Sequence, residues 1–70
     1  MVDVNQDLLK IVQSSAYPTD VRVGAAQGLG YSAGAEERKA LIDVAKSSAY
    51  PNEVRAAAAK AAGQATQRLI

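Results

Sequence analysis

Two arginines recur at equivalent places in a peptide that the chain carries twice, and they are well suited to bind an anion. Arg22 ends the peptide S-S-A-Y-P-T-D-V-R, which begins at Ser14, and Arg55 ends S-S-A-Y-P-N-E-V-R, which begins at Ser47. A guanidinium group presents several donors in a geometry that suits phosphate and carboxylate groups. The doubled peptide is therefore either a pair of ligand-binding loops, with a basic pair of arginines, or a connector that a repeated architecture requires.

Side chains for covalent or metal-dependent catalysis are scarce. The 70 residues include no cysteine and no histidine, which excludes disulfides, Cys- or His-based metal sites and histidine-activated nucleophiles. Lys46 adjoins Ser47, but neighbouring residues on a helix do not face each other. The scattered carboxylates form no acid–base pair. We therefore expect a protein that is not an enzyme and that binds no metal or other cofactor.

The charge and hydropathy of the chain narrow the classes of partner. The net charge is +1, with acidic and basic residues interspersed, so no strong field favours nucleic acid or a membrane surface. No apolar run approaches the roughly 20 residues that span a bilayer, and the first residues do not resemble a signal peptide. We expect a cytoplasmic protein that does not associate with membranes.

The elements that carry these residues repeat along the chain. A shift of 33 residues superimposes many identical pairs: Leu8 and Leu41, Ser14 and Ser47, Tyr17 and Tyr50, Pro18 and Pro51, Val21 and Val54, Arg22 and Arg55, Ala25 and Ala58, Ala26 and Ala59, and Gly30 and Gly63. Self-similarity at a fixed spacing is typical of stacked repeats. We expect a single domain over residues 1–70, with one repeat over about 3–31 and the second over about 35–68.

Each repeat has the pattern of two helices. Apolar residues recur at helical spacing before each Tyr-Pro pair and again after it, and no alternating pattern indicates a strand. Asp3 and Gln6 resemble a capping box for the first helix. The prolines end the first helix of each repeat. Thr19 and Asn52 are the expected N-caps of the second helices, unless each proline takes the first helical position.

The border between the repeats is expected at a glycine-rich segment. The residues G-Y-S-A-G, from Gly30 to Gly34, separate the two units. Glu36 and Glu37 follow, and acidic residues are favourable in the first turn of a helix. The organisation is helix, turn, helix, loop, helix, turn, helix.

The second helix of each repeat carries a motif known from a family of helical repeats. Val21-Arg22, Ala25-Ala26 and Leu29-Gly30 stand in the order of that motif, and the second copy has Ala62 at the place of the leucine. The chain thus resembles HEAT-like repeat proteins, of the short kind found in phycobilin lyases. The resemblance implies an all-α fold of two tandem helical hairpins (four helices), stacked as a short α-solenoid. It also implies that Arg22 and Arg55 form an inter-repeat ladder with Asp20 and Glu53.

The positions where the two copies differ are further candidates for specific contacts. Tyr31 has Gln64 as its counterpart, while Gly24 and Gly28 stand where the second copy has alanine. Small residues four apart let another helix approach closely, either within the chain or from a second molecule. Tyr17 and Tyr50 are able to stack on a ligand, or each packs beneath its own turn.

The leading hypothesis is a protein–protein interaction module that self-associates. Two repeats leave two open ends, and Leu69 and Ile70 are large apolar residues that need cover. We expect a homo-oligomer, such as a homodimer, built end to end or by exchange of helices.

Two alternatives use other features of the same sequence. The first is weak nucleic-acid binding along the second helices, and its residues are Arg22, Arg55, Lys60 and Arg68. The overall charge argues against it. The second alternative, an accessory subunit of a chromophore-lyase-like system, rests on the family resemblance alone.

Overall fold

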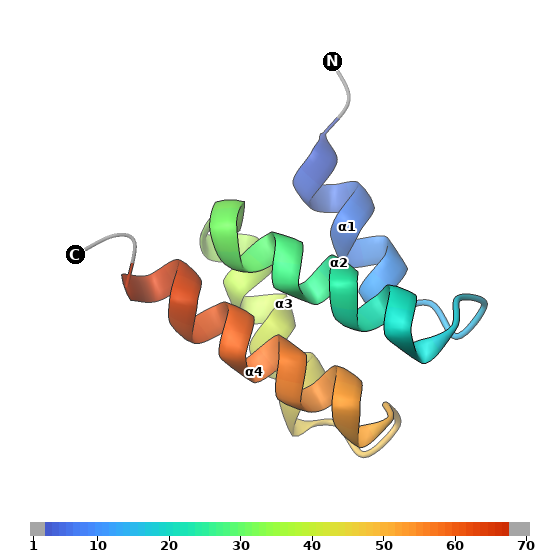
Figure 1. Cartoon of the computed structure of the whole chain (residues 1–70). Helices are drawn as coiled ribbons and strands as arrows, with labels where there is room; N and C mark the ends of the chain where they lie inside the picture. The colour runs from blue at the N-terminus through green and yellow to red at the C-terminus, as the bar shows by residue number, and fades with distance from the viewer. Residues whose placement is uncertain (1–2, 68–70) are drawn as a thin grey trace.

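Four α-helices form the structure, a computed structural model that describes residues 3–67. They are α1 (Val4–Gln13), α2 (Thr19–Ser32), α3 (Ala35–Lys46) and α4 (Asn52–Gln67) (Figure 1). No strand occurs within these described residues. The all-helical fold class predicted from the sequence is confirmed.

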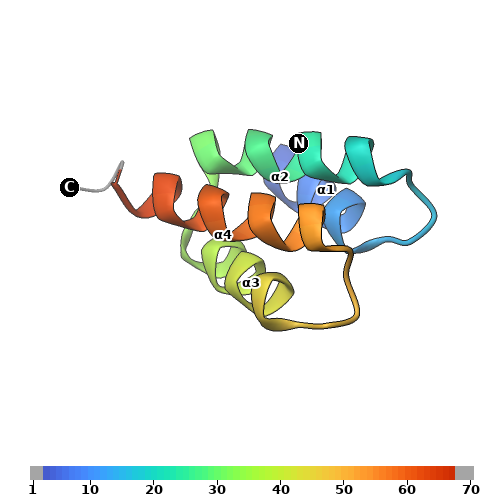
Figure 2. The ribbon, with the colours of Figure 1, turned by 60° about the horizontal axis from the view of Figure 1, so that its bottom comes forward.

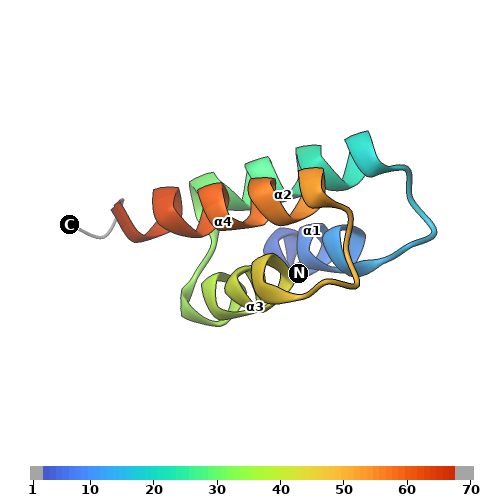
Figure 3. The ribbon, with the colours of Figure 1, turned by 90° about the horizontal axis from the view of Figure 1, so that it is seen from below.

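The helices form two hairpins arranged in two layers. We call α1 with α2 the first hairpin and α3 with α4 the second hairpin. Helices α2 and α4 lie side by side and run in the same direction in one layer, while α1 and α3 lie in the other (Figures 2 and 3). The two connectors within the hairpins lie at the same edge of the molecule (Figure 3). The body is compact, with extents of 31 × 28 × 16 Å.

The start of α1 follows the capping pattern only in part. Asp3 is the N-cap, and its carboxylate accepts a hydrogen bond from the backbone N–H of Gln6. The side-chain amide of Gln6 does not close the reciprocal half of a capping box. It donates instead to Oε2 of Glu37 in the second hairpin, at 2.8 Å. The predicted cap is thus confirmed, while Gln6 contributes to a contact between the two hairpins.

The doubled Ser-Ser-Ala-Tyr-Pro peptide is a connector between helices in both hairpins. Ser14 is the C-cap of α1, and its hydroxyl accepts a hydrogen bond from the backbone N–H of Ala16. Ser47 is the C-cap of α3, and its hydroxyl accepts the equivalent bond from the backbone N–H of Ala49. These local bonds satisfy backbone groups at the helix ends. The serines therefore serve the turn in both hairpins.

The second helices start at the residues that follow the prolines. Thr19 is the first residue of α2, and Pro18 is its N-cap, so the N-cap expected at Thr19 lies one residue earlier. The carbonyl of Pro18 accepts from the N–H of Arg22, and the carbonyl of Pro51 accepts from that of Arg55. Proline suits this position because the lack of a backbone N–H costs no helical hydrogen bond there, and its carbonyl accepts the first hydrogen bond of the helix.

Helix α2 is longer than the sequence predicts. It continues through Gly30 and ends at Ser32, which leaves Ala33 and Gly34 as the link to α3. Ser32 is bonded to the side chain of Asn5, whose amide donates to the Ser32 carbonyl at 2.8 Å. Gly30 does not end the helix because tertiary contacts at this position outweigh its weak helix propensity.

Alanine makes up much of the core between the layers, together with a few larger side chains. The largest fully buried side chains are Leu29, Leu41, Val12, Val44 and Val54. Two other large residues of the same pattern, Val21 and Ile42, stay 44% and 39% exposed. The exposure of these two residues is central to the candidate site.

Candidate functional site

Arg22 is buried at the end of α1 instead of lying on an open surface. Its Nε donates to the carbonyl oxygen of Val12 at 3.0 Å, and only 6% of the residue is exposed. Val12 lies in the last turn of α1, where carbonyl groups lack partners within the helix and a positive charge is favourable. The arginine therefore fastens α2 to the end of α1.

Tyr50 covers this arginine from the other hairpin. The guanidinium carbon of Arg22 lies 5.3 Å from the centre of the Tyr50 ring, a cation–π geometry. Tyr50 belongs to the second connector, so the contact joins the two hairpins. The sequence left open a ligand-stacking position or a tyrosine packed beneath its own turn. In the structure Tyr50 packs against the core and contacts the arginine of the other hairpin.

Arg55 makes the same kind of contact with the end of the preceding helix, but among the described residues it lacks the covering tyrosine that Arg22 has. Its Nε donates to the carbonyl oxygen of Ala45 at 3.0 Å, and the residue is half-buried. The two arginines thus bind the ends of the preceding helices, and not the acidic ladder that the family resemblance implies. Asp20 instead accepts a hydrogen bond from the backbone N–H of Val21 at 2.9 Å. A shared anion site of the two arginines is not formed, because Arg22 is enclosed.

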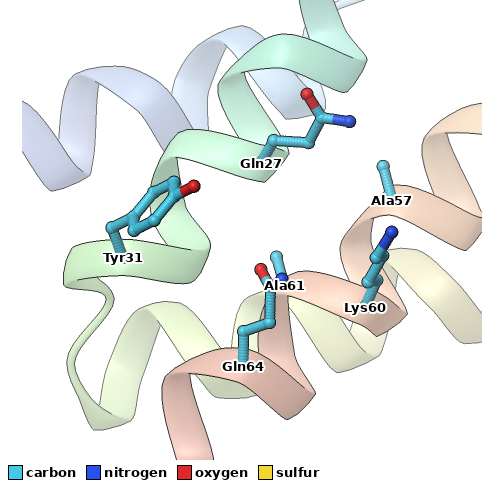
Figure 4. Close-up of a pocket in the computed structure, with 6 residues that line it drawn as sticks. All are labelled: Gln27, Tyr31, Ala57, Lys60, Ala61 and Gln64. Atoms are coloured by element: carbon cyan, nitrogen blue, oxygen red, sulfur yellow. The ribbon is translucent and has the colours of Figure 1, made fainter. Parts of the chain in front are cut away.

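A shallow groove between α2 and α4 holds two other residues that the sequence singled out. Gln27 and Tyr31 extend from α2, and Lys60 and Gln64 extend from α4 on the other side (Figure 4). Ala57 and Ala61 line the same groove. Tyr31 is 81% exposed and Lys60 is exposed. Tyr31 and Lys60 thus lie on opposite sides of the groove, one on each helix.

The two glycines of the sequence hypothesis differ from a third glycine that it overlooked. A Cβ atom added at Gly24 would meet nothing within 4 Å, and one at Gly28 would touch only the side chain of Leu8, at 3.5 Å. A Cβ at Gly30 would lie 2.5 Å from Oε1 of Gln64 and 3.4 Å from Cα of Ala61. The close approach of α2 and α4 thus occurs at Gly30, while Gly24 and Gly28 are left for other contacts.

Replacing Gly24 by alanine is expected to raise the free energy of unfolding by about 1 kcal/mol, because alanine is the better helix former and the space is open. Gly30→Ala is the matched control, since the same gain in propensity is offset in part by contact with Cα of Ala61, at 3.4 Å, and by the shift that the end of the Gln64 side chain must make. Urea denaturation followed by circular dichroism measures both. A gain for Gly30→Ala as large as that for Gly24→Ala would contradict the packing argument.

Equivalent positions of the two repeats differ in burial in a regular way. One set is buried in the second hairpin while its counterparts in the first are more exposed; Val54, for example, is fully buried and Val21 is not. We call the more exposed members the N-terminal face: Val4, Leu8, Ile11, Tyr17, Val21, Gly24 and Gly28.

A second set shows the opposite difference. Leu9 is buried in the first hairpin, whereas its counterpart Ile42 is exposed. We call the more exposed members of this set the C-terminal face: Ile42, Ala45, Arg55, Ala59, Gly63 and Thr66. The burial difference follows from position, because each hairpin covers one side of the other through α2 with α4 and α1 with α3. Within residues 3–67, the opposite side of each hairpin is not covered by another helix.

The C-terminal face is hollowed between α3 and α4. Ile42, Ala59, Gly63 and Thr66 line this groove together with Ala35, Arg38, Lys39 and Ala62. The Nε atom of Arg38 is buried there, with no hydrogen-bond partner among the described residues. This groove is not among the features predicted from the sequence. The repeat does contain a signal for it, because several of the residues that line the groove are the counterparts of residues that are buried in the first hairpin.

Two of the candidate residues, Leu69 and Ile70, lie outside the described residues. No helix in the part of the chain that the structure describes is long and apolar enough to cross a membrane. Comparison with protein-family models, with curated proteins and with solved structures finds no match to this chain. The candidate site is therefore defined by the geometry of this chain alone.

Proposed function

We propose that the chain is a non-catalytic protein–protein interaction module that self-associates through its two open faces. The fold is proposed to be a short HEAT-like solenoid, a description supported by the doubled motif and by the parallel course of α2 and α4. The observation that carries the proposal is the exposure of Val21 and Ile42, whose repeat counterparts Val54 and Leu9 are buried between the hairpins.

The chemistry of the faces supports association with protein over other partners. Both faces combine aliphatic side chains with glycine or alanine. Removing such apolar surfaces from water lowers the free energy, which favours association with another apolar surface. The alternative of nucleic-acid binding is weakened, because Arg22 is enclosed by Val12 and Tyr50 and does not lie on the surface that would bind nucleic acid. Of the other basic residues of that alternative, Arg55 is half-buried, Lys60 is exposed and Arg68 lies outside the described residues. The net charge of +1 also gives little attraction to duplex DNA.

Sedimentation velocity over a concentration series tests this proposal. We expect the apparent mass to rise above the 7.3 kDa of one chain as the concentration increases through the micromolar range. Association by apolar burial should persist in high salt, since ionic screening acts on charged contacts. A compact monomer throughout this range would overturn the proposal.

A further inference from the structure

We propose that copies of this chain join head to tail, with the N-terminal face of one copy seated on the C-terminal face of the next. This inference rests on the proposed self-association and specifies its geometry. The contact would repeat, between two chains, the register that joins the two hairpins within one chain. The internal interface thus serves as the template for the external one.

The pair formed by Arg22 and Tyr50 is the first element of the template. Within the chain, the tyrosine of the second connector covers the arginine of the first hairpin, at 5.3 Å. The equivalent residues, Arg55 and Tyr17, are divided between the C-terminal face and the N-terminal face. Arg55 binds the Ala45 carbonyl but is only half-buried, and Tyr17 is 45% exposed. In the head-to-tail contact, Tyr17 of the next copy would cover Arg55.

The groove on the C-terminal face supplies the second element. Its residues Ile42, Ala59 and Gly63 are the counterparts of Leu9, Ala26 and Gly30. All three counterparts are buried in the first hairpin, which packs against the second. The groove is thus the surface that would receive another hairpin of the same kind.

The N-terminal face carries the matching half of this contact. Leu8 and Val21 stand where the second hairpin has Leu41 and Val54, both fully buried. Gly28 stands where the second hairpin has Ala61, whose Cα would lie 3.4 Å from a Cβ atom at Gly30. In the contact between copies, Gly28 of one chain would approach Gly63 of the other, and neither position carries a side chain that obstructs it.

One polar bond of the template has no counterpart, so the external contact should be weaker. Within the chain, Gln6 donates to Glu37 across the two hairpins. The counterparts of these residues in the contact between copies are Lys39 and Val4, which form no such bond. Two separate chains also lose translational and rotational freedom when they associate. Both effects predict association that depends on concentration.

A head-to-tail contact uses two different surfaces, and this property makes it testable. A contact between two identical faces closes as a symmetric dimer, whereas a contact between different faces leaves a free face at each end and continues. Val21→Glu places a carboxylate on the N-terminal face, and Gly63→Glu places one on the C-terminal face. Both sites are exposed helical positions, and glutamate is a better helix former than glycine.

The decisive experiment is sedimentation velocity of the wild type, of each variant alone and of an equimolar mixture of the variants. We expect a series of masses for the wild type and a monomer for each variant alone, because burial of an unpaired carboxylate weakens each contact at least about tenfold. The mixture should form a one-to-one dimer and stop, since one intact face remains on each chain. Ser15→Glu, at an exposed connector position, adds the same charge outside both faces and should behave as the wild type. Circular dichroism confirms that all the variants are folded.

The possible outcomes separate this inference from the proposed function. A wild type that stays monomeric would overturn both. A wild type that associates, with only one of the two variants impaired, would indicate a symmetric contact through a single face and overturn the head-to-tail geometry alone. A mixture that contains no dimer, or variants that associate as the wild type does, would overturn it as well.

Discussion

Replacing Leu29 by alanine is expected to lower the free energy of unfolding by about 3 kcal/mol, the typical effect of such a truncation in a tightly packed core. Leu29 is fully buried in α2, and it is among the few large side chains of a core that consists mostly of alanine. Alanine neighbours cannot rotate to fill the space that the leucine leaves. A domain of this size has roughly 3–5 kcal/mol of stability from its core, so the variant should keep only about 0–2 kcal/mol and be marginally stable at moderate temperature.

Urea denaturation followed by far-ultraviolet circular dichroism measures this loss. Ile42→Ala is the matched control, because it removes a side chain of the same size from a position that is 39% exposed. Its expected loss is below about 1 kcal/mol when the protein is dilute enough to be monomeric. Equal losses for Leu29→Ala and Ile42→Ala would contradict the assignment of Leu29 to the core.

Replacing Arg22 by alanine is expected to cost about 2–3 kcal/mol, since it removes a charged hydrogen bond and a cation–π contact together. The substitution leaves the Val12 carbonyl at the end of α1 without the Arg22 Nε and removes the group beneath Tyr50. Both hairpins lose a contact, because the arginine fastens α2 to α1 and also joins the second connector. The thermal unfolding midpoint should fall accordingly.

Arg55→Ala is the internal control that the repeat provides. Arg55 makes the same hydrogen bond, to Ala45, but it is only half-buried. We therefore expect a loss of about 1 kcal/mol, which is the usual net contribution of one hydrogen bond. Comparison of the two variants by thermal and urea unfolding isolates the effect of the Tyr50 cover and the burial. If Arg55→Ala cost as much as Arg22→Ala, the contact between the hairpins would not contribute as proposed.

The helices and connectors could be predicted from the sequence because their signals are local. Asp3 caps α1, and Glu36 and Glu37 lie in the first turn of α3, as predicted. The errors occur where distant contacts act on a local signal. The sequence predicts a border between the repeats at Gly30, but Gly30 lies within α2 and lets Ala61 of α4 come close.

The candidate site could be predicted less well, for a related reason. The sequence indicates two equivalent arginines, because the residues that flank Arg22 and Arg55 are almost the same. Arg22 is enclosed by a tyrosine from the other hairpin, whereas Arg55 is at the open end. Residue type and spacing do not tell which member of a repeated pair will be covered.

The sequence by itself determined that this protein has helical hairpins, where their connectors lie and which residues are equivalent in the two copies. Only the tertiary structure decided which member of each pair is buried. Val21 and Val54 follow almost the same residues, yet the first is 44% exposed and the second is enclosed. The physical reason is that local propensity acts through neighbours in the chain, whereas burial depends on what lies across the interface. A hairpin at the end of a row has a partner on one side only, and that difference creates the two open faces.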